Sequence, residues 1–216
     1  MLVIFDVEGV LFDAEYLPIL GEKLNKEKEI WDITKKGIQG VINWEEGLRQ
    51  RIDSLKGLDY ETCQQVADSL PIMTGAKEAC QILKAAGWKL MAVSGGFTIM
   101  TERLQKELDL DYVFSNELIF KDGKLDGVTV KVDSDKAKSA KIKIQEWNQT
   151  KDDIVVVVDG ANDLALFDIC DLGIAFRAQD KVKDVANIIL EEKDLSKILD
   201  IINKHYNLAL ETPTIA

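Results

Sequence analysis

Four short apolar runs constrain the fold of this chain more than any other feature. Each is strand-length, rich in aliphatic residues and free of the polar alternation expected of a strand with one solvent-facing side. Such runs are typical of a parallel sheet buried on both faces, and the helical patterns between them predict an open α/β sheet. The runs are Leu2–Phe5, Leu90–Val93, Ile154–Val158 and Leu172–Phe176.

The region between the first two runs interrupts this alternation. From about residue 13 to residue 70 it shows helical patterns without a convincing strand, and it is too long for an ordinary crossover. We therefore expect a small helical cap domain at residues 13–72, inserted into an α/β core formed by 1–12 and 73–207. We also expect a hairpin that turns at Asp122-Gly123, and a frayed tail at 208–216.

Capping residues predict where one core helix begins and ends. Thr74 is a candidate N-cap and Gly87 stands at a C′ position, so a helix is predicted over Gly75–Ala86. Further helical patterns run over Ile99–Leu108, Lys136–Trp147, Leu164–Cys170 and Leu195–Tyr206.

Composition limits the classes of partner. The chain has 216 residues, of which 46% are hydrophobic and 30% charged, as in an ordinary globular protein. Its 27 Lys and Arg against 38 Asp and Glu give a formal charge of −11, which opposes binding to nucleic acid. No stretch approaches membrane-spanning length, so neither nucleic acid nor a membrane is expected as a partner. The three scattered cysteines are expected as buried thiols in a reducing compartment, which predicts a cytoplasmic location. The sequence leaves the oligomeric state open.

Polar residues follow three of the apolar runs. Asp6-Val7-Glu8-Gly9 comes after the first, Ser94-Gly95-Gly96 after the second, and Asp159-Gly160-Ala161-Asn162-Asp163 after the third. Ligands bind outside the carboxyl ends of strands in open α/β sheets, and this collection suits a hard cation together with a phosphoryl group. The chemistry it permits is attack of Asp6 on phosphorus, with Glu8 as general acid and base.

Each motif alone has an ordinary structural explanation. A D-x-E pair is more often a solvated strand end, Ser-Gly-Gly is usually a turn, and DGAND fits a turn that caps a helix. Their order at three strand ends, with a lysine-rich segment between the second and the third, favours the functional interpretation.

Four stretches in this order resemble the motifs of the haloacid dehalogenase (HAD) phosphatase superfamily, and within it most of all the phosphoserine phosphatases. They are FDVEGVL, VSGGF, the lysine at 136 before a helix, and VDGANDLALF. The resemblance runs from Leu2 to about Tyr206. It implies a HAD-like doubly wound parallel sheet (a Rossmannoid core) with a small helical cap after the first strand. It also implies Mg²⁺-dependent hydrolysis of O-phospho-L-serine, the last step of serine biosynthesis, through an aspartyl-phosphate.

The resemblance assigns roles to individual residues. Asp6 is implied as the nucleophile and Glu8 as the acid/base. The implied Mg²⁺ ligands are Asp6, the backbone carbonyl of Glu8, and Asp159, with Asp163 supporting the metal's water shell. The implied phosphate-binding residues are Ser94, Gly95, Asn162 and Lys136, with Lys138 as the alternative lysine.

The cap is implied to read the rest of the substrate. Glu15 would meet the substrate ammonium and Arg51 its carboxylate, while Ile38 and Trp44 would form an apolar wall. Arg suits a carboxylate because its planar fork donates two parallel hydrogen bonds. From the residues alone, Glu15 and Arg51 fit exposed helix charges equally well.

Glu8 departs from the phosphoserine phosphatase pattern, which usually has Asp there. The extra methylene moves the acid/base, which would slow attack by water and leave time for an alcohol to intercept the aspartyl-phosphate. Two alternatives therefore stay open. One is a phosphatase or phosphotransferase for another small phosphomonoester, including transfer to homoserine, and the other is a non-catalytic binder of a phosphorylated amino acid.

Overall fold

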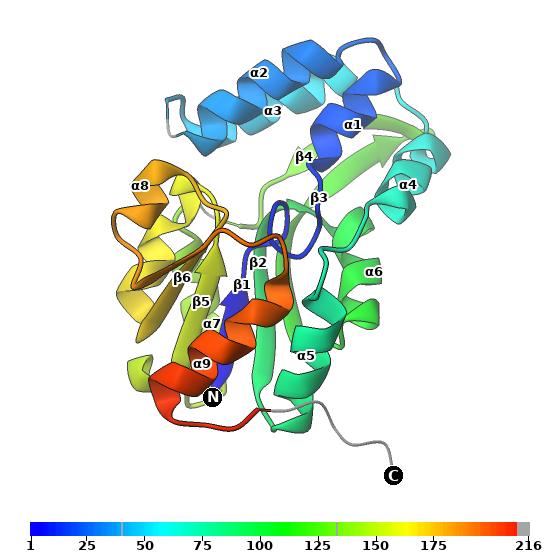
Figure 1. Cartoon of the computed structure of the whole chain (residues 1–216). Helices are drawn as coiled ribbons and strands as arrows, with labels where there is room; N and C mark the ends of the chain where they lie inside the picture. The colour runs from blue at the N-terminus through cyan, green and yellow to red at the C-terminus, as the bar shows by residue number, and fades with distance from the viewer. Residues whose placement is uncertain (40, 133, 211–216) are drawn as a thin grey trace.

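The four apolar runs predicted as strands lie within one sheet (Figure 1). The computed structural model describes residues 1–39, 41–132 and 134–210, although not the side chain of Ile38. Within these residues the sheet has seven strands in the order β4-β3-β2-β1-β5-β6-β7. The central strand β1 pairs in parallel with β2 and β5, which confirms the predicted α/β fold. The strands are β1 (Leu2–Phe5), β2 (Lys89–Phe97), β3 (Tyr112–Lys121), β4 (Lys124–Thr129), β5 (Ile154–Val158), β6 (Leu172–Phe176) and β7 (Ile188–Leu190).

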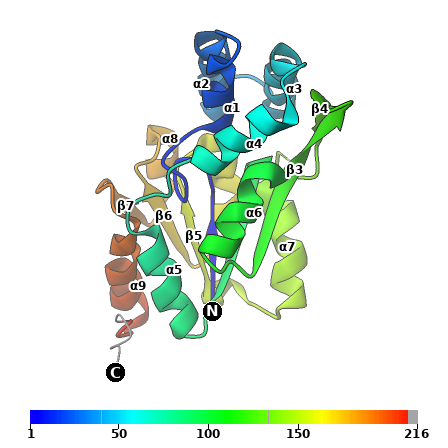
Figure 2. The ribbon, with the colours of Figure 1, turned by 90° about the vertical axis from the view of Figure 1, so that its right-hand side faces the viewer.

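Both faces of the sheet are covered, which explains why β1 is apolar at every position. Val3 and Phe5 pack into the cluster that holds α5, α6 and α9, whereas Leu2 and Ile4 pack into the cluster that holds α7, α8 and η2. Figure 2 shows α5 and α9 on one side of the sheet and α7 on the other. These helices are α5 (Ala76–Ala85), α6 (Thr98–Glu107), α7 (Lys136–Glu146), α8 (Asp180–Lys183) and α9 (Ile198–Tyr206), with 3-10 turns η1 (Lys151–Asp153), η2 (Ala161–Ile169) and η3 (Leu195–Lys197).

Four helices follow β1, as the sequence predicts for residues 13–70. They lie beyond the end of the sheet at which β1 ends (Figures 1 and 2). Their apolar residues, among them Leu48 and Ile52, belong to the same buried cluster as Phe5, so apolar packing is continuous from the sheet into these helices. The helices are α1 (Tyr16–Glu22), α2 (Glu27–Ile38), α3 (Trp44–Leu55) and α4 (Tyr60–Ser69).

The two chain segments that connect these helices to the sheet pair with each other. The Asp13 N–H donates to the Pro71 carbonyl at 2.9 Å, and the Met73 N–H donates to the Leu11 carbonyl at 2.8 Å. Arg103 on α6 donates to the carbonyls at the end of α4, including that of Leu70 at 2.5 Å. The segments that enter and leave these helices therefore form one hydrogen-bonded connection instead of two independent linkers.

Several local features differ from the sequence predictions. Gly75, with φ 78°, is the N-cap of α5 instead of Thr74, whose carbonyl accepts from the Leu195 N–H. The pattern predicted as a helix from residue 164 is the 3-10 run η2, and β7 was not predicted. In the predicted tail, Leu210 exchanges two hydrogen bonds with the Asn203 side chain, and residues 211–216 lie outside the described residues.

The hairpin and the thiols agree with the sequence predictions. β3 and β4 are antiparallel and joined at Asp122-Gly123, where both residues have positive φ. Cys63, Cys80 and Cys170 are buried and free. Among the described residues, no helix has both the length and the apolar character that a membrane span requires.

Gly75 and Gly87 give a matched test of the start of α5. Both have positive φ, at 78° and 80°. A Cβ at Gly75 would collide with the Asp194 side chain and the Ser196 backbone, whereas a Cβ at Gly87 would meet open space. We expect Gly87→Ala to lower the free energy of unfolding by about 1 kcal/mol and Gly75→Ala by about 3 kcal/mol, measured by urea denaturation. Equal losses would show that the contact with η3 adds nothing.

Candidate active site

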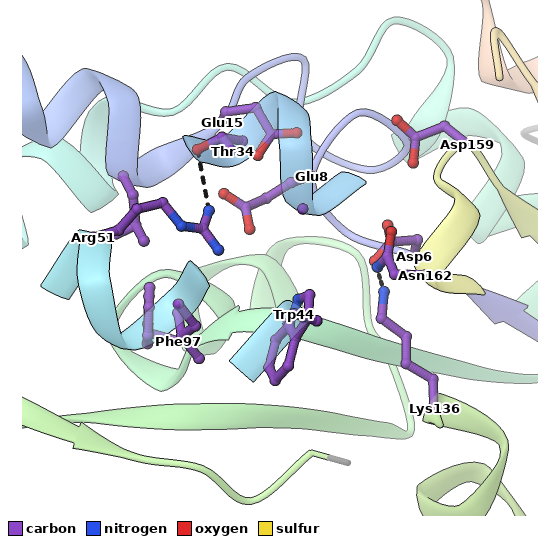
Figure 3. A pocket seen from close by; sticks show the side chains of 14 residues that line it. Asp6, Glu8, Glu15, Thr34, Trp44, Arg51, Phe97, Lys136, Asp159 and Asn162 are labelled. Atoms are coloured by element: carbon purple, nitrogen blue, oxygen red, sulfur yellow. Dashed lines mark hydrogen bonds and ion pairs between the residues drawn. The ribbon is translucent and has the colours of Figure 1, made fainter. Parts of the chain in front are cut away.

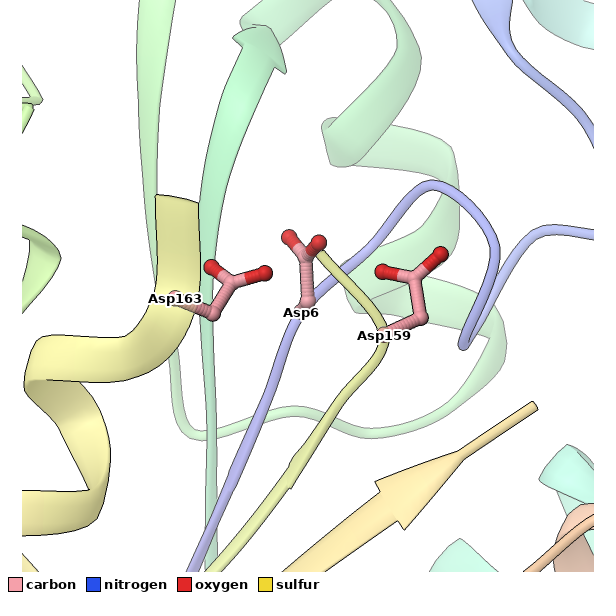
Figure 4. Close-up of side chains that lie close together, drawn as sticks. All are labelled: Asp6, Asp159 and Asp163. Atoms are coloured by element: carbon pink, nitrogen blue, oxygen red, sulfur yellow. The ribbon is translucent and has the colours of Figure 1, made fainter. Parts of the chain in front are cut away.

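The carboxylates predicted at the strand ends lie close together (Figure 4). Asp6 follows β1 directly, and its N–H donates to the Val157 carbonyl at 3.1 Å, which continues the β1–β5 pairing by one residue. Asp159 follows β5, and Asp163 stands in η2. The sheet itself therefore fixes where the Asp6 carboxylate stands.

Asp6, Asp159 and Asp163 form a group that fits a cation. One carboxylate oxygen from each lies within 4.8 Å of the other two. Burial, together with the charges of Asp6 and Asp163, raises the pKa of Asp159 well above its ordinary value. Burial and the Asp6 charge raise the pKa of Asp163 from 3.8 to about 7. Crowded buried carboxylates of this kind are relieved by a hard cation that takes oxygen ligands.

Lys136 supplies a positive charge inside this group. It is the first residue of α7 and only 3% exposed, and its Nζ lies 2.7 Å from Asp6 Oδ1 and 2.5 Å from Asp163 Oδ1. Burial acts to lower the pKa of Lys136, but the two carboxylates outweigh burial and raise that pKa. The ammonium is therefore charged at neutral pH. Lys138, the other lysine considered from the sequence, is exposed.

The end of β2 approaches the same place through its glycines. Gly95 lines the pocket, whereas Ser94 is buried and is not among the lining residues. The Ser94 Oγ accepts from the Gly96 N–H at 2.9 Å. A Cβ at Gly96 would come within 2.9 Å of Glu8 Oε2 and 3.0 Å of Ser94 Oγ, so both side chains lie against this glycine. The end of β2 therefore brings Glu8 and Ser94 close together beside the pocket.

Asn116 joins two parts of the site and was not predicted. This fully buried residue of β3 donates from Nδ2 to the Gly95 carbonyl at 2.9 Å. Its Oδ1 accepts from the backbone N–H groups of Lys131 and Val132 at 2.9 and 3.0 Å. The side chain thus connects Gly95, near the end of β2, to the segment that leads into Lys136. In the sequence, Asn116 stands between two other polar residues, Ser115 and Glu117, so no signal distinguished it.

Glu8 is held in place by the chain that follows it. Its Oε1 accepts from the Tyr16 N–H at 2.7 Å, at the start of α1. Burial raises the pKa of Glu8, and although the Tyr16 hydrogen bond opposes this effect, the resulting pKa is above the ordinary value. A carboxyl group that keeps its proton to higher pH is suited to act as a general acid.

The inserted helices contribute the opposite wall of the pocket (Figure 3). Burial and the neighbouring charges, first that of Glu8, raise the pKa of Glu15 well above its ordinary value. Arg51 on α3 donates from Nε to the Gly47 carbonyl and from Nη1 to Thr34 Oγ1, both at 3.1 Å. The Trp44 ring lies against Gly95, where an added Cβ would be 2.9 Å from it.

The structure brings most of the predicted site residues to this one pocket. Asp163 pairs with Lys136 and is not among the lining residues, Ser94 is buried near the end of β2, and the Ile38 side chain is outside the described residues. The predicted residues that line the pocket are Asp6, Glu8, Glu15, Trp44, Gly95, Arg51, Lys136, Asp159 and Asn162. The sequence did not single out the other lining residues, which are Leu17, Thr34, Gly37, Leu48 and Phe97.

Charge limits what this pocket can bind. The lining carries the carboxyl groups of Asp6, Glu8, Glu15 and Asp159 against the two cationic side chains of Lys136 and Arg51. A phosphate would be repelled by this set unless a bound cation or protonated carboxyl groups reduced the negative charge. The arrangement therefore suits a metal and a phosphorylated ligand bound together.

Comparison with known proteins identifies relatives over most of the chain. A family model described as haloacid dehalogenase-like hydrolase matches residues 1–167. A phosphoserine phosphatase of Methanocaldococcus jannaschii is 37% identical over 206 residues, which cover 93% of this chain and 97% of the relative. A phosphoserine phosphatase of Archaeoglobus fulgidus is 35% identical over 205 residues and 93% of this chain, but the match spans only 59% of that relative's length.

Solved structures show the same relationship. A structure of a phospho-aspartyl intermediate analogue of phosphoserine phosphatase superposes with a TM-score of 0.90 at 34% identity. A substrate-bound phosphoserine phosphatase complex also gives 0.90, at 33% identity. Each comparison covers 93% of this chain and 97% of the other.

Asp163 predicts how the stability of the metal-free protein changes with pH. Its pKa is about 7 when folded and about 3.8 when unfolded, so between these values the folded state holds a proton that the unfolded chain has lost. This contribution is complete below about pH 4 and is lost as the pH rises through 7. With chelator present, we expect urea denaturation to show a loss of about 2 kcal/mol between pH 5 and pH 7.5.

Substitution separates this effect from general charge repulsion. Asp163→Asn removes the titrating group and should reduce the loss, whereas Asp180→Asn, at a fully exposed aspartate, should leave the loss unchanged. Stability that stays constant or rises from pH 5 to pH 7.5 would contradict the raised pKa of Asp163.

Proposed function

The chain belongs to the haloacid dehalogenase-like hydrolases, and we propose that it is a Mg²⁺-dependent phosphoserine phosphatase. The reaction would convert O-phospho-L-serine to L-serine and phosphate, as the last step of serine biosynthesis. The observation that carries the proposal is one pocket with Asp6 and Lys136 on one wall and Glu15 and Arg51 on the other. The first pair suits a phosphoryl group and the second pair suits an amino acid.

Asp6 is the proposed nucleophile. Its Oδ1 is held by Lys136, which leaves its second oxygen for attack on phosphorus. The bond from phosphorus to the serine oxygen breaks, and Glu8 gives its proton to that oxygen. Glu8 then takes a proton from water, which attacks the aspartyl-phosphate and releases phosphate and the free Asp6 carboxylate.

The phosphoryl group and the cation are given neighbouring places in this proposal. Lys136, Asn162, Gly95 and the buried Ser94 would stabilise the phosphoryl oxygens. Asp6, the Glu8 backbone carbonyl and Asp159 would hold Mg²⁺, with Asp163 supporting its water shell. When bound, Mg²⁺ would neutralise the crowded carboxylates and polarise the phosphoryl group. The raised pKa values of Asp159 and Asp163 support a cation at this place.

The amino acid portion would be read by the inserted helices. Glu15 would bind the substrate ammonium and Arg51 its carboxylate, while Trp44 and Ile38 would form the apolar wall. We propose that residues 13–72 act as a cap domain on a core formed by 1–12 and 73–207. The joined connection at Leu11–Met73 supports motion of this cap as one unit. We also place the enzyme in the cytoplasm, which the three free thiols support.

Activity on a small panel of phosphomonoesters tests the proposal. We expect Mg²⁺-dependent release of phosphate from O-phospho-L-serine, abolished by chelator, with lower kcat/KM on phosphothreonine and an aryl phosphate. Asp6→Asn should lower kcat at least about 1000-fold because it removes the nucleophile. Asp180→Asn serves as the exposed control. Full activity in Asp6→Asn, or turnover of the aryl phosphate alone, would refute the proposal.

Glu8 favours a second candidate, phosphoryl transfer to an alcohol. The Tyr16 N–H holds the Glu8 carboxylate, so the side chain that is longer by one methylene has a defined position. With O-phospho-L-serine as donor and homoserine as acceptor, we expect Glu8→Asp to raise the ratio of hydrolysis to transfer by roughly tenfold, equivalent to about 1.4 kcal/mol. An unchanged ratio would show that the length of residue 8 does not decide between water and alcohol.

A further inference from the structure

Thr34 stands out because it is the only hydroxyl side chain among the described residues that line the pocket. It lies within α2 and is 1% exposed. Its Oγ1 donates to the Ile30 carbonyl at 2.8 Å, one helical turn earlier. Since the hydroxyl has one proton and that proton is committed, the oxygen presents only acceptor sites to the pocket.

Arg51 uses that acceptor. Its Nη1 donates to Thr34 Oγ1 at 3.1 Å, and its Nε donates to the Gly47 carbonyl at 3.1 Å (Figure 3). These two hydrogen bonds hold the guanidinium between α2 and α3. The Nη2 hydrogens and the second Nη1 hydrogen have no hydrogen-bond partner within the described part of the chain, and they remain for a ligand.

These hydrogen bonds matter because the carboxyl groups of Glu8 and Glu15 compete for the Arg51 guanidinium. The charges of Glu8 and Glu15 both act on Arg51. Within the described residues, however, the guanidinium hydrogen-bonds to Thr34 and Gly47 and forms an ion pair with neither carboxyl group. If the guanidinium paired with Glu8, the donors that it uses there would no longer be available to a ligand. The Thr34 hydroxyl, a neutral acceptor on α2, opposes this pairing without adding charge.

We propose that Thr34 is a positioning residue that holds the Arg51 guanidinium away from Glu8 and directs its free donors to the substrate carboxylate. Through Arg51, Thr34 determines selectivity for a phosphomonoester that carries a carboxylate. This inference rests on the proposed function and adds a residue to its recognition site.

Two substrates that differ only in the carboxylate test it. O-phosphoethanolamine has the phosphate and ammonium of O-phospho-L-serine but lacks the carboxylate. We expect Thr34→Val, which keeps the shape and removes the hydroxyl, to lower the ratio of kcat/KM for phosphoserine over phosphoethanolamine about tenfold. The change should fall mainly on KM for phosphoserine, and Thr34→Ser should restore the ratio.

Two further variants separate positioning from packing. Thr101→Val is the matched control, since Thr101 is also buried and hydrogen-bonded but lies on α6 with its hydroxyl directed to Ser115. Its ratio should equal that of the wild type. In an Arg51→Ala background, Thr34→Val should produce no further fall in the ratio.

The outcomes distinguish this inference from the proposed function. Equal losses on both substrates, an unchanged ratio in Thr34→Val, or failure of Thr34→Ser to restore it would overturn the role of Thr34 while the phosphatase proposal stands. A wild-type protein that does not hydrolyse phosphoserine would overturn both. A selective loss with rescue by serine supports the positioning role.

Discussion

The site depends on the ion pairs that Lys136 makes with Asp6 and Asp163. Where the buried parallel strands end, three carboxyl groups lie close together and away from bulk water. Burying them together costs free energy, which appears as the raised pKa values of Asp159 and Asp163. One buried ammonium offsets part of this cost and leaves the rest for a cation. The site can therefore form in the folded protein while it still carries excess negative charge. That excess is the condition for binding a metal together with a phosphate.

The groups proposed to act on phosphorus and those proposed to bind the amino acid lie on different segments, which meet where β1 leads into α1. The strand ends hold the groups proposed to act on phosphorus, and the helices between β1 and α5 hold those proposed to read the amino acid. Glu8 belongs to both sides, since its backbone continues from β1 while its carboxylate is held by the first N–H of α1. A displacement of α1 would therefore change the environment of the proposed general acid. This coupling arises because the helices are inserted between Asp6 and the rest of the sheet.

The sequence was informative where a residue's position follows from its own neighbours. Asp6 and Asp159 could be predicted because each follows a buried strand, and the strands could be recognised by their unbroken apolar character. Lys136 and Arg51 needed the resemblance to a family, since nothing local distinguishes them from exposed charges. Thr34 and Asn116 could not be predicted. Their partners, Arg51 and Gly95, are 17 and 21 residues away and come within reach only when two helices or two strands pack. The N-cap of α5 at Gly75 was missed for a similar reason, because Gly75 lies against Asp194 and Ser196, which are distant in the sequence.

The order of strands in the sheet also governs how the molecule is made. β1 leaves the ribosome first, yet its partners lie at residues 89–92 and 154–157. At ordinary rates of synthesis the first strand waits roughly 10–30 s for the second partner. Pairing over such separations is slow, because loop closure must precede any gain from contacts. During that interval an apolar segment has no sheet to enter, and Asp6 has no Asp159 beside it. A truncated chain that ends before β5 therefore lacks the cation cluster, so the site cannot exist before synthesis has passed β5.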